Sequence, residues 1–192
     1  MNRKRFLGYL LDILLLSLIT TMIYLIIPQN QNVATLEKEL DTANTSFFNE
    51  EIDLTTFVNR YADITLDLTK ANAIYTVADI CFIIIWFIGI PLNNNGQTIG
   101  QKMMRVKIKR DDNNKLTFND LFLRALIVNG IWTTLISLAI TYTLSSMGYF
   151  IVASIISFIQ TFIILISCVM IVNSNDARGI QDKISKTHIE EV

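Results

Sequence analysis

Four long apolar stretches dominate the pattern of hydrophobic and polar residues along the chain. A helix needs roughly 20 apolar residues to cross a hydrocarbon core about 30 Å thick. The stretches near residues 6–27, 74–92, 125–144 and 147–172 satisfy this length. The pattern therefore predicts an all-α integral membrane protein built as a four-transmembrane-helix bundle, with 1–192 as a single membrane domain.

The first stretch has a rival interpretation as a secretory signal peptide, because Arg3, Lys4 and Arg5 precede it. Three features argue against a signal peptide. The apolar run is longer than the roughly 7–15 residues of a signal peptide, Asp12 interrupts it, and no clear A-x-A cleavage site follows. We therefore expect a retained transmembrane helix.

The segment 28–73 is polar, but apolar residues recur in it at near-helical spacing, as in Leu54, Phe57, Val58 and Tyr61. This spacing predicts one or two amphipathic helices. They are interpreted either as an external lid or partner surface, or as a solvated cap that packs its apolar stripe on the bundle. Packing is the commoner use of such a stripe and is the favoured interpretation.

The segment 93–124 contains an alternation of apolar and basic residues from Met104 to Lys109, and Leu116 and Phe118 alternate in the same way after the turn-prone residues 111–114. This period of two predicts a short hairpin with a basic face. Each cation near anionic inner-leaflet lipid contributes about 1 kcal/mol, so lipid docking is expected. No aromatic residues alternate with the basic ones to stack bases, which argues against nucleic-acid binding.

Composition agrees with a membrane protein, because 52% of the residues are hydrophobic and 17% are charged. Charge also predicts orientation. The segment 93–124 has seven Lys or Arg against three acids, whereas 28–73 has three against eight. By the positive-inside rule both termini, the basic loop 93–124 and the tail 173–192 are cytoplasmic, and 28–73 is extracytoplasmic.

The sequence offers no constellation of residues for catalysis or metal binding. The only histidine, His188, lies in the tail, and both cysteines, Cys81 and Cys168, lie inside apolar runs. A zinc site has no ligand set here, and no nucleophile is paired with a base. We expect no enzyme activity, no metal and no cofactor.

Polar residues inside the predicted spans are the candidate functional groups: Asp12, Asp79, Asn129 and Gln160. A carboxylate in a span costs about 2.5–3.5 kcal/mol on insertion scales, so Asp12 is expected to face the bundle. Asp12 and Asn129 are predicted at similar depth, which favours a hydrogen bond between them with Arg124 as counter-charge. These side chains either line a polar route or only hold helices together, and both interpretations stay open.

Arg5 precedes Asp12 by seven residues, nearly two helical turns, or about 10 Å of rise. An ion pair between them is not expected, because the Arg5 side chain leans away toward water. We expect Arg5 to anchor its helix at the lipid phosphates.

Three segments together resemble the RDD family, small bacterial membrane proteins named for one Arg and two Asp. They are RFLGYLLD with Arg5 and Asp12, GQTIGQKMMRVKI followed by the Leu-Phe-Leu-Arg that ends at Arg124, and ARGIQDKISKTHI with Asp182 and Thr187. Gly96, Thr98 and Gly100 form the loop signature. Departures are Gln101 where Lys is usual and Ile180-Gln181 where Leu-His is usual.

The resemblance implies a multi-pass protein of the bacterial cytoplasmic membrane, with transport of an unidentified ligand commonly suggested and no catalytic residues to carry over. Two hypotheses follow. The chain transports a small cation or proton with Asp12 as the intramembrane acid, working as a homo-oligomer. Alternatively, it is a non-transporting adaptor or regulator that binds a partner through 28–73 or through the cytoplasmic loop and tail.

Overall fold

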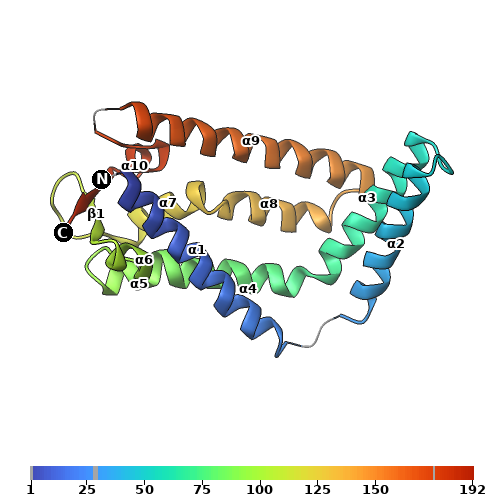
Figure 1. Ribbon diagram of the computed structural model, residues 1–192, viewed down its shortest axis with the longest axis horizontal. Helices are drawn as coiled ribbons and strands as arrows, with labels where there is room; N and C mark the ends of the chain where they lie inside the picture. Colours follow the sequence, from blue (N-terminus) through green and yellow to red (C-terminus); the bar gives the residue numbers. More distant parts are fainter. Residues whose placement is uncertain (1, 28–29, 175) are drawn as a thin grey trace.

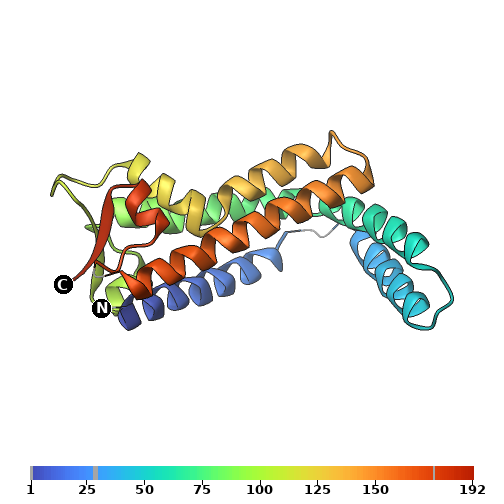
Figure 2. The same cartoon turned by 90° about the horizontal axis from the view of Figure 1, so that it is seen from above.

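The computed structural model describes residues 2–27, 30–174 and 176–192; residues 28–29 of the predicted outer segment and residue 175 of the predicted tail lie outside these ranges. The molecule is elongated and mostly helical. The chain ends lie at one extremity and a helical hairpin lies at the other (Figures 1 and 2). The described elements, in chain order, are α1 (Asn2–Tyr24), α2 (Asn32–Phe48), α3 (Leu54–Ala71), α4 (Ala73–Ile84), η1 (Ile85–Gly89), α5 (Ile90–Asn93), α6 (Ile99–Met103), β1 (Val106–Arg110), α7 (Phe118–Val128), α8 (Ile131–Thr141), α9 (Ser146–Asn173), α10 (Ile180–Ile184) and β2 (Thr187–Glu191).

Three described helical stretches are long and apolar enough to cross a membrane, by length and composition: Arg3–Tyr24, Ala73–Asn93 and Ser146–Asn173. The predicted span 125–144 is not one continuous helix. It is divided into α7 and α8, which are bent by 69° and count together as a fourth candidate. The first, second and fourth predicted spans therefore correspond to continuous helical stretches, and the third is broken.

The break between α7 and α8, in the third span along the chain, lies at Asn129 and Gly130. Gly130 adopts a left-handed conformation with φ +63°, which favours glycine, so the helix cannot continue through it. The broken turn is held from α9, where Gln160 donates to the carbonyl of Ile127 at 2.8 Å and accepts from the Trp132 indole at 2.7 Å. Gln160 therefore supplies hydrogen bonds that the interrupted helix lacks.

The second span contains a π-helical turn, η1, in which the Ile90 N–H donates to the carbonyl of Ile85. Pro91 follows directly and has no N–H to donate to the carbonyl four residues earlier, which disfavours ordinary α-helical bonding at this point. Trp86 lies in this turn and is buried, with 6% of its surface exposed.

The segment 28–73 contains two antiparallel helices, α2 and α3, consistent with the spacing of its apolar residues. Asp53 caps α3 by accepting the Thr56 N–H at 2.8 Å. The hairpin is joined by a stacked Phe47–Phe57 pair, and α3 packs along the beginning of α9 through Tyr61 and Phe150. The apolar stripe is thus used for packing, and the turn of the hairpin points away from the bundle (Figure 2).

The predicted hairpin within 93–124 is wrong. β1 pairs antiparallel with β2 near the end of the chain, with Ile108 opposite Ile189. Phe118 does not extend a second strand but begins α7, which Thr117 and Asp120 cap reciprocally. The alternation correctly indicates a strand at β1, but a period of two does not identify the strand's partner.

The units α6–β1 and α10–β2 have the same local structure. Each is a five-residue helix, followed by a residue with positive φ (Arg105 at 55°, Lys186 at 51°) and a five-residue strand. The backbone bonds Met104 N–H to Gly100 and Arg105 N–H to Lys102 recur as Ser185 N–H to Gln181 and Lys186 N–H to Lys183. Because Ile108 and Ile189 are equivalent residues that face each other, the two units are related by a local pseudo-two-fold axis.

These two units form what we call the cap: α6, β1, α10 and β2. Its apolar side joins the buried core of the molecule, which is formed by Ile88, Val106, Ile108, Leu121, Ala125, Ile131 and Ile189. The cap therefore packs one end of the helices together, and it brings the two termini of the chain to that end (Figure 1).

Candidate functional site

Asp12 is fully buried where α1 crosses α6. Its carboxylate accepts hydrogen bonds from the Trp86 indole at 3.0 Å, the Thr98 hydroxyl at 2.5 Å and the Gly100 backbone N–H at 2.8 Å. All three partners are uncharged donors from the second span and the segment that follows it. We call this arrangement the Asp12 junction.

Glycine is required at position 100 because α1 and α6 approach closely there. A Cβ at Gly100 would lie 2.2 Å from the carbonyl oxygen of Gly8 and 2.9 Å from the carboxyl carbon of Asp12. Thr98 caps α6 together with Gln101. Thr98 and Gly100 of the loop signature therefore lie at the start of α6, where both donate hydrogen bonds to the Asp12 carboxylate.

Gly96 has a separate role. It has φ +82°, and a Cβ there would lie 2.3 Å from the Ile108 carbonyl oxygen. Its own carbonyl accepts the Ile108 N–H at 2.8 Å, so Gly96 joins the loop before α6 to strand β1.

A second buried junction brings together Arg5, Arg124 and Asp182, three residues that the sequence singles out but does not place together. Asp182 is fully buried; Arg5 donates to one of its carboxylate oxygens at 2.5 Å and Arg124 donates to the other. The Gly179 N–H also donates to Asp182, at 2.9 Å. We call this arrangement the Asp182 junction.

Each of the two arginines also makes a further hydrogen bond within the protein. Arg5 donates to the carbonyl of Ala177 at 2.8 Å, and Arg124 donates to the Thr187 hydroxyl at 2.9 Å. Burial by itself raises the pKa of Asp182, but the charges of Arg124 and Arg5 outweigh this effect and hold the pKa below its usual value. The carboxylate therefore stays ionised between the two guanidinium groups.

These junctions correct three expectations. Asp12 is bonded to Trp86, Thr98 and Gly100, so the predicted Asp12–Asn129 hydrogen bond is wrong. Arg124 neutralises Asp182 and not Asp12. Arg5 does not extend to lipid phosphates, because its side chain is only 10% exposed and is paired with Asp182. As expected, Arg5 and Asp12 are not paired with each other.

The other intramembrane polar residues lie apart from these junctions. Asp79 accepts a hydrogen bond from the Tyr24 hydroxyl, near the opposite end of α1. Asn129 ends α7, and Gln160 holds the break in the third span. In the described part of the chain no hydrogen bond links any two of Asp12, Asp79, Asn129 and Gln160, so they do not form one continuous hydrogen-bonded route.

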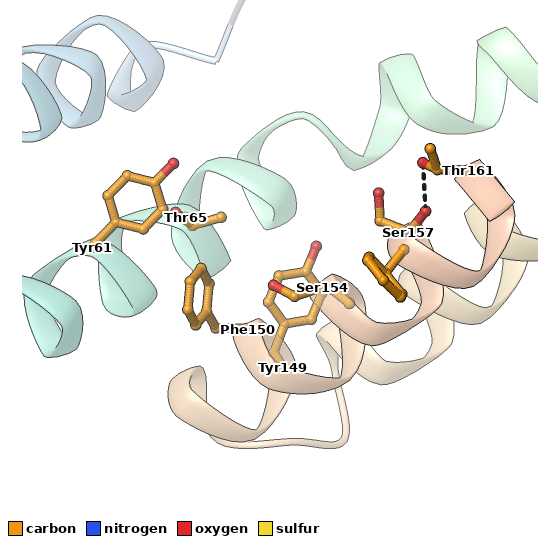
Figure 3. A pocket seen from close by; sticks show the side chains of 9 residues that line it. Tyr61, Thr65, Tyr149, Phe150, Ser154, Ser157 and Thr161 are labelled. Atoms are coloured by element: carbon orange, nitrogen blue, oxygen red, sulfur yellow. Dashed lines mark hydrogen bonds between the residues drawn. The ribbon is translucent and has the colours of Figure 1, made fainter.

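An open groove of about 510 Å³ lies between α3 and α9 (Figure 3). Aromatic and hydroxyl side chains line it, including Tyr61, Tyr149, Ser154 and Ser157. None of the site residues predicted from sequence is among its lining residues. Within residues 2–27, 30–174 and 176–192 no group of three or more His, Cys, Asp or Glu side chains is arranged to hold a metal.

Sequence reasoning missed Trp86 as a partner of Asp12. A signal was present, because Pro91 disturbs the helix within five residues of a Trp whose indole N–H needs an acceptor when it is buried. It also missed Ser167 on α9, which accepts the Ile180 N–H at 3.2 Å and contacts Gln181. Nothing in the apolar run around Ser167 distinguishes it from other span serines.

The fold and the two junctions define the class of protein: a helical membrane protein whose spans are joined at one end by buried acidic side chains. Comparison with protein-family models matches residues 2–186 to the RDD family, so the chain belongs to this family. Neither the curated proteins nor the solved structures searched gave a match. The resemblance assigns the family's Arg and two Asp to Arg5, Asp12 and Asp182, and the structure divides these three residues between two junctions.

Proposed function

We propose that this RDD protein is a four-span, non-enzymatic protein of the bacterial cytoplasmic membrane that transports a small cation or proton, with Asp12 as its intramembrane acid. One observation carries the proposal. Asp12 is a fully buried carboxylate whose three hydrogen-bond partners are all uncharged. Intramembrane acids commonly mark ion or proton pathways, because their charge is costly to bury without a counter-charge.

Two irregular helices support the same function. The third span is broken at Gly130, and the second contains the π-helical turn that carries Trp86. Discontinuous helices and π-turns are frequent where transporters bind their ions, since they free backbone groups and permit local movement. The distribution of basic residues supports cytoplasmic termini and an extracytoplasmic α2–α3 hairpin. Because four spans leave little room for a pathway within one chain, we propose that it works as a homo-oligomer.

The test is flux of protons and of alkali cations in proteoliposomes that contain the full chain. Asp12→Asn keeps the size of the side chain and removes its charge, so flux is expected to fall to the level of empty liposomes. Asp63→Asn, an exposed acid on α3, is the matched control and is expected to keep wild-type flux. Undiminished flux through a correctly inserted Asp12→Asn protein contradicts the proposal, as does absence of flux in the wild type.

A second candidate function, a membrane adaptor or regulator, is favoured by the turn of the α2–α3 hairpin. Phe48 and Leu54, at the two ends of this turn, are 81% and 63% exposed, and exposed apolar side chains grouped in this way can mark a partner surface. The adaptor hypothesis expects crosslinking to recover a partner protein that Phe48→Ser loses. Recovery of the chain alone, or only with itself, argues against it.

A further inference from the structure

The two equivalent units of the cap present the same kinds of side chain outward. In α6–β1 these are Lys102, Met103 and Arg105, and at the corresponding positions of α10–β2 they are Lys183, Ile184 and Lys186. Met103 is 59% exposed and Ile184 is 52% exposed. We call these two sets of three residues the basic turns.

The cations of the basic turns differ from the other cations of the cap in their pairing. Lys107 and Lys109 on β1 are both paired with Glu190 on β2, at 3.0 and 3.5 Å. In the described chain no ion pair joins Lys102, Arg105, Lys183 or Lys186 to an acid. The two lysines of the sheet therefore share one carboxylate, whereas the basic turns hold four exposed cations, of which Lys183 also acts electrostatically on Asp176.

Arg105 and Lys186 occupy a backbone conformation that glycine adopts at lower cost. Their φ values are 55° and 51°, and a residue at this point after a helix is usually Gly. The chain has a long cation at both equivalent positions, although its backbone would be less strained with glycine. Glycine can therefore replace either cation without straining the turn.

Both basic turns lie at the ends of the spans. α6 packs on the first turns of α1, where the carbonyl oxygen of Gly8 faces Gly100. α10 packs on the end of α9 through Ser167. Each basic turn has an exposed apolar side chain between two cations. This combination suits the boundary between acyl chains, which an apolar side chain can enter, and headgroups, which cations can contact.

We infer that the basic turns are two equivalent binding sites for anionic lipid headgroups of the same leaflet. In each turn the Lys and the left-handed cation contact lipid phosphates, and Met103 or Ile184 enters the acyl boundary. This differs from docking of β1, whose two lysines share the Glu190 carboxylate within the cap. The inference rests on membrane insertion and is independent of transport.

The experiment measures phosphatidylglycerol binding to the purified full chain in neutral detergent by native mass spectrometry, with phosphatidylcholine as the comparison lipid. Two anionic lipids are expected to be retained per chain. The double variants Lys102→Gln/Arg105→Gln and Lys183→Gln/Lys186→Gln each remove one site, with affinity there falling about 25-fold at about five-fold per cation. The other site remains occupied.

Lys107→Gln/Lys109→Gln is the matched control, because it removes the same charge from the same cap and is expected to keep both lipids. Arg105→Gly and Lys186→Gly test the sites without straining the fold, since each relieves the left-handed backbone while weakening lipid binding about five-fold. Equal loss in the control, unchanged retention in the double variants, or equal binding of phosphatidylcholine overturns the inference.

Discussion

Asp12 and Asp182 are both fully buried, and the chain stabilises the two carboxylates by different means. Asp12 accepts hydrogen bonds from neutral donors, whereas Asp182 lies between two arginines. The Asp182 junction therefore has a net positive charge and is saturated by its own partners. The Asp12 junction surrounds a carboxyl group with neutral donors and has no bonded cation, which is the observation behind the transport proposal.

The Asp182 junction makes stability depend on pH. The pKa of Asp182 is below its usual value in the folded protein. Its contribution is therefore complete above the unfolded pKa of about 3.9 and is lost as pH falls through the lower, folded pKa. Thermal unfolding in detergent, followed from pH 7 down to about pH 2, is expected to show this loss beginning near pH 4.

Asp182→Asn leaves two buried arginines without a carboxylate and is expected to destabilise the protein at pH 7 by about 3–5 kcal/mol. It is also expected to reduce the loss of thermal stability that the wild type shows at acidic pH. Asp41→Asn, on the exposed face of α2, serves as the control and is expected to match the wild type. If Asp182→Asn loses as much thermal stability at acidic pH as the wild type does, this assignment to Asp182 is contradicted.

At this scale the sequence singled out the charged residues that form the two junctions, but not their partners. Arg5, Asp12 and Arg124 stand out because charge in or beside an apolar run is costly. Asp182 stands out only through the resemblance of the tail to the RDD family. Their pairing depends on where α10 packs, and Asp182 is 177 residues from Arg5. Depth along a helix placed Asp12 near Asn129, but depth gives no information about which face of each helix meets which.

At the scale of elements, the break between α7 and α8 depends on a side chain from α9. Gln160 bonds the Ile127 carbonyl on one side of the break and Trp132 on the other. Hydropathy predicted a span here because both halves are apolar. The Asn129-Gly130 pair is a common turn signal whose effect an average over 20 residues conceals.

Gln160→Leu removes both hydrogen bonds and is expected to destabilise the protein by about 1–2 kcal/mol, since the freed carbonyl and indole N–H have no water to replace the amide. Thr161→Val is the control, because the Thr161 hydroxyl bonds only the Ser157 carbonyl of its own helix. Thermal unfolding in detergent gives both values. Equal stability of Gln160→Leu and wild type would mean that the break is held by packing alone.

The strand β1 shows a similar limit of sequence reasoning. Its alternation identified the element, but the nearest later alternation in sequence was not its partner. The true partner, β2, alternates Thr187 and Ile189 inward with His188 and Glu190 outward. That pattern is present in the tail, and the pairing of Lys107 and Lys109 with Glu190 agrees with the register observed.

At the scale of the whole molecule, the tail joins segments that are far apart in sequence. α10 and β2 contact α7, α9 and β1, and Asp182 also reaches α1. Removing residues 178–192 is expected to expose Val106 and Ile108 and to leave Arg5 and Arg124 without their carboxylate. Limited proteolysis is expected to cut the 111–116 loop much faster in this shortened chain.

Cleavage at the 49–53 turn of the α2–α3 hairpin provides an internal reference, because the hairpin lies at the other end of the molecule (Figure 1). Its rate is expected to be unchanged. Similar cutting of the 111–116 loop in both chains would show that the cap is stable without α10 and β2.

The Asp182 junction also imposes an order on biogenesis. A ribosome synthesises Arg5 and Arg124 well before Asp182, so the spans enter the bilayer while both guanidinium groups still lack their carboxylate. Until the tail is released, these charges must stay in water at the membrane surface, where they retain the first and third spans in the correct orientation. Tail docking is then a late step of assembly, because neither guanidinium group can pair with Asp182 before residue 182 has been synthesised.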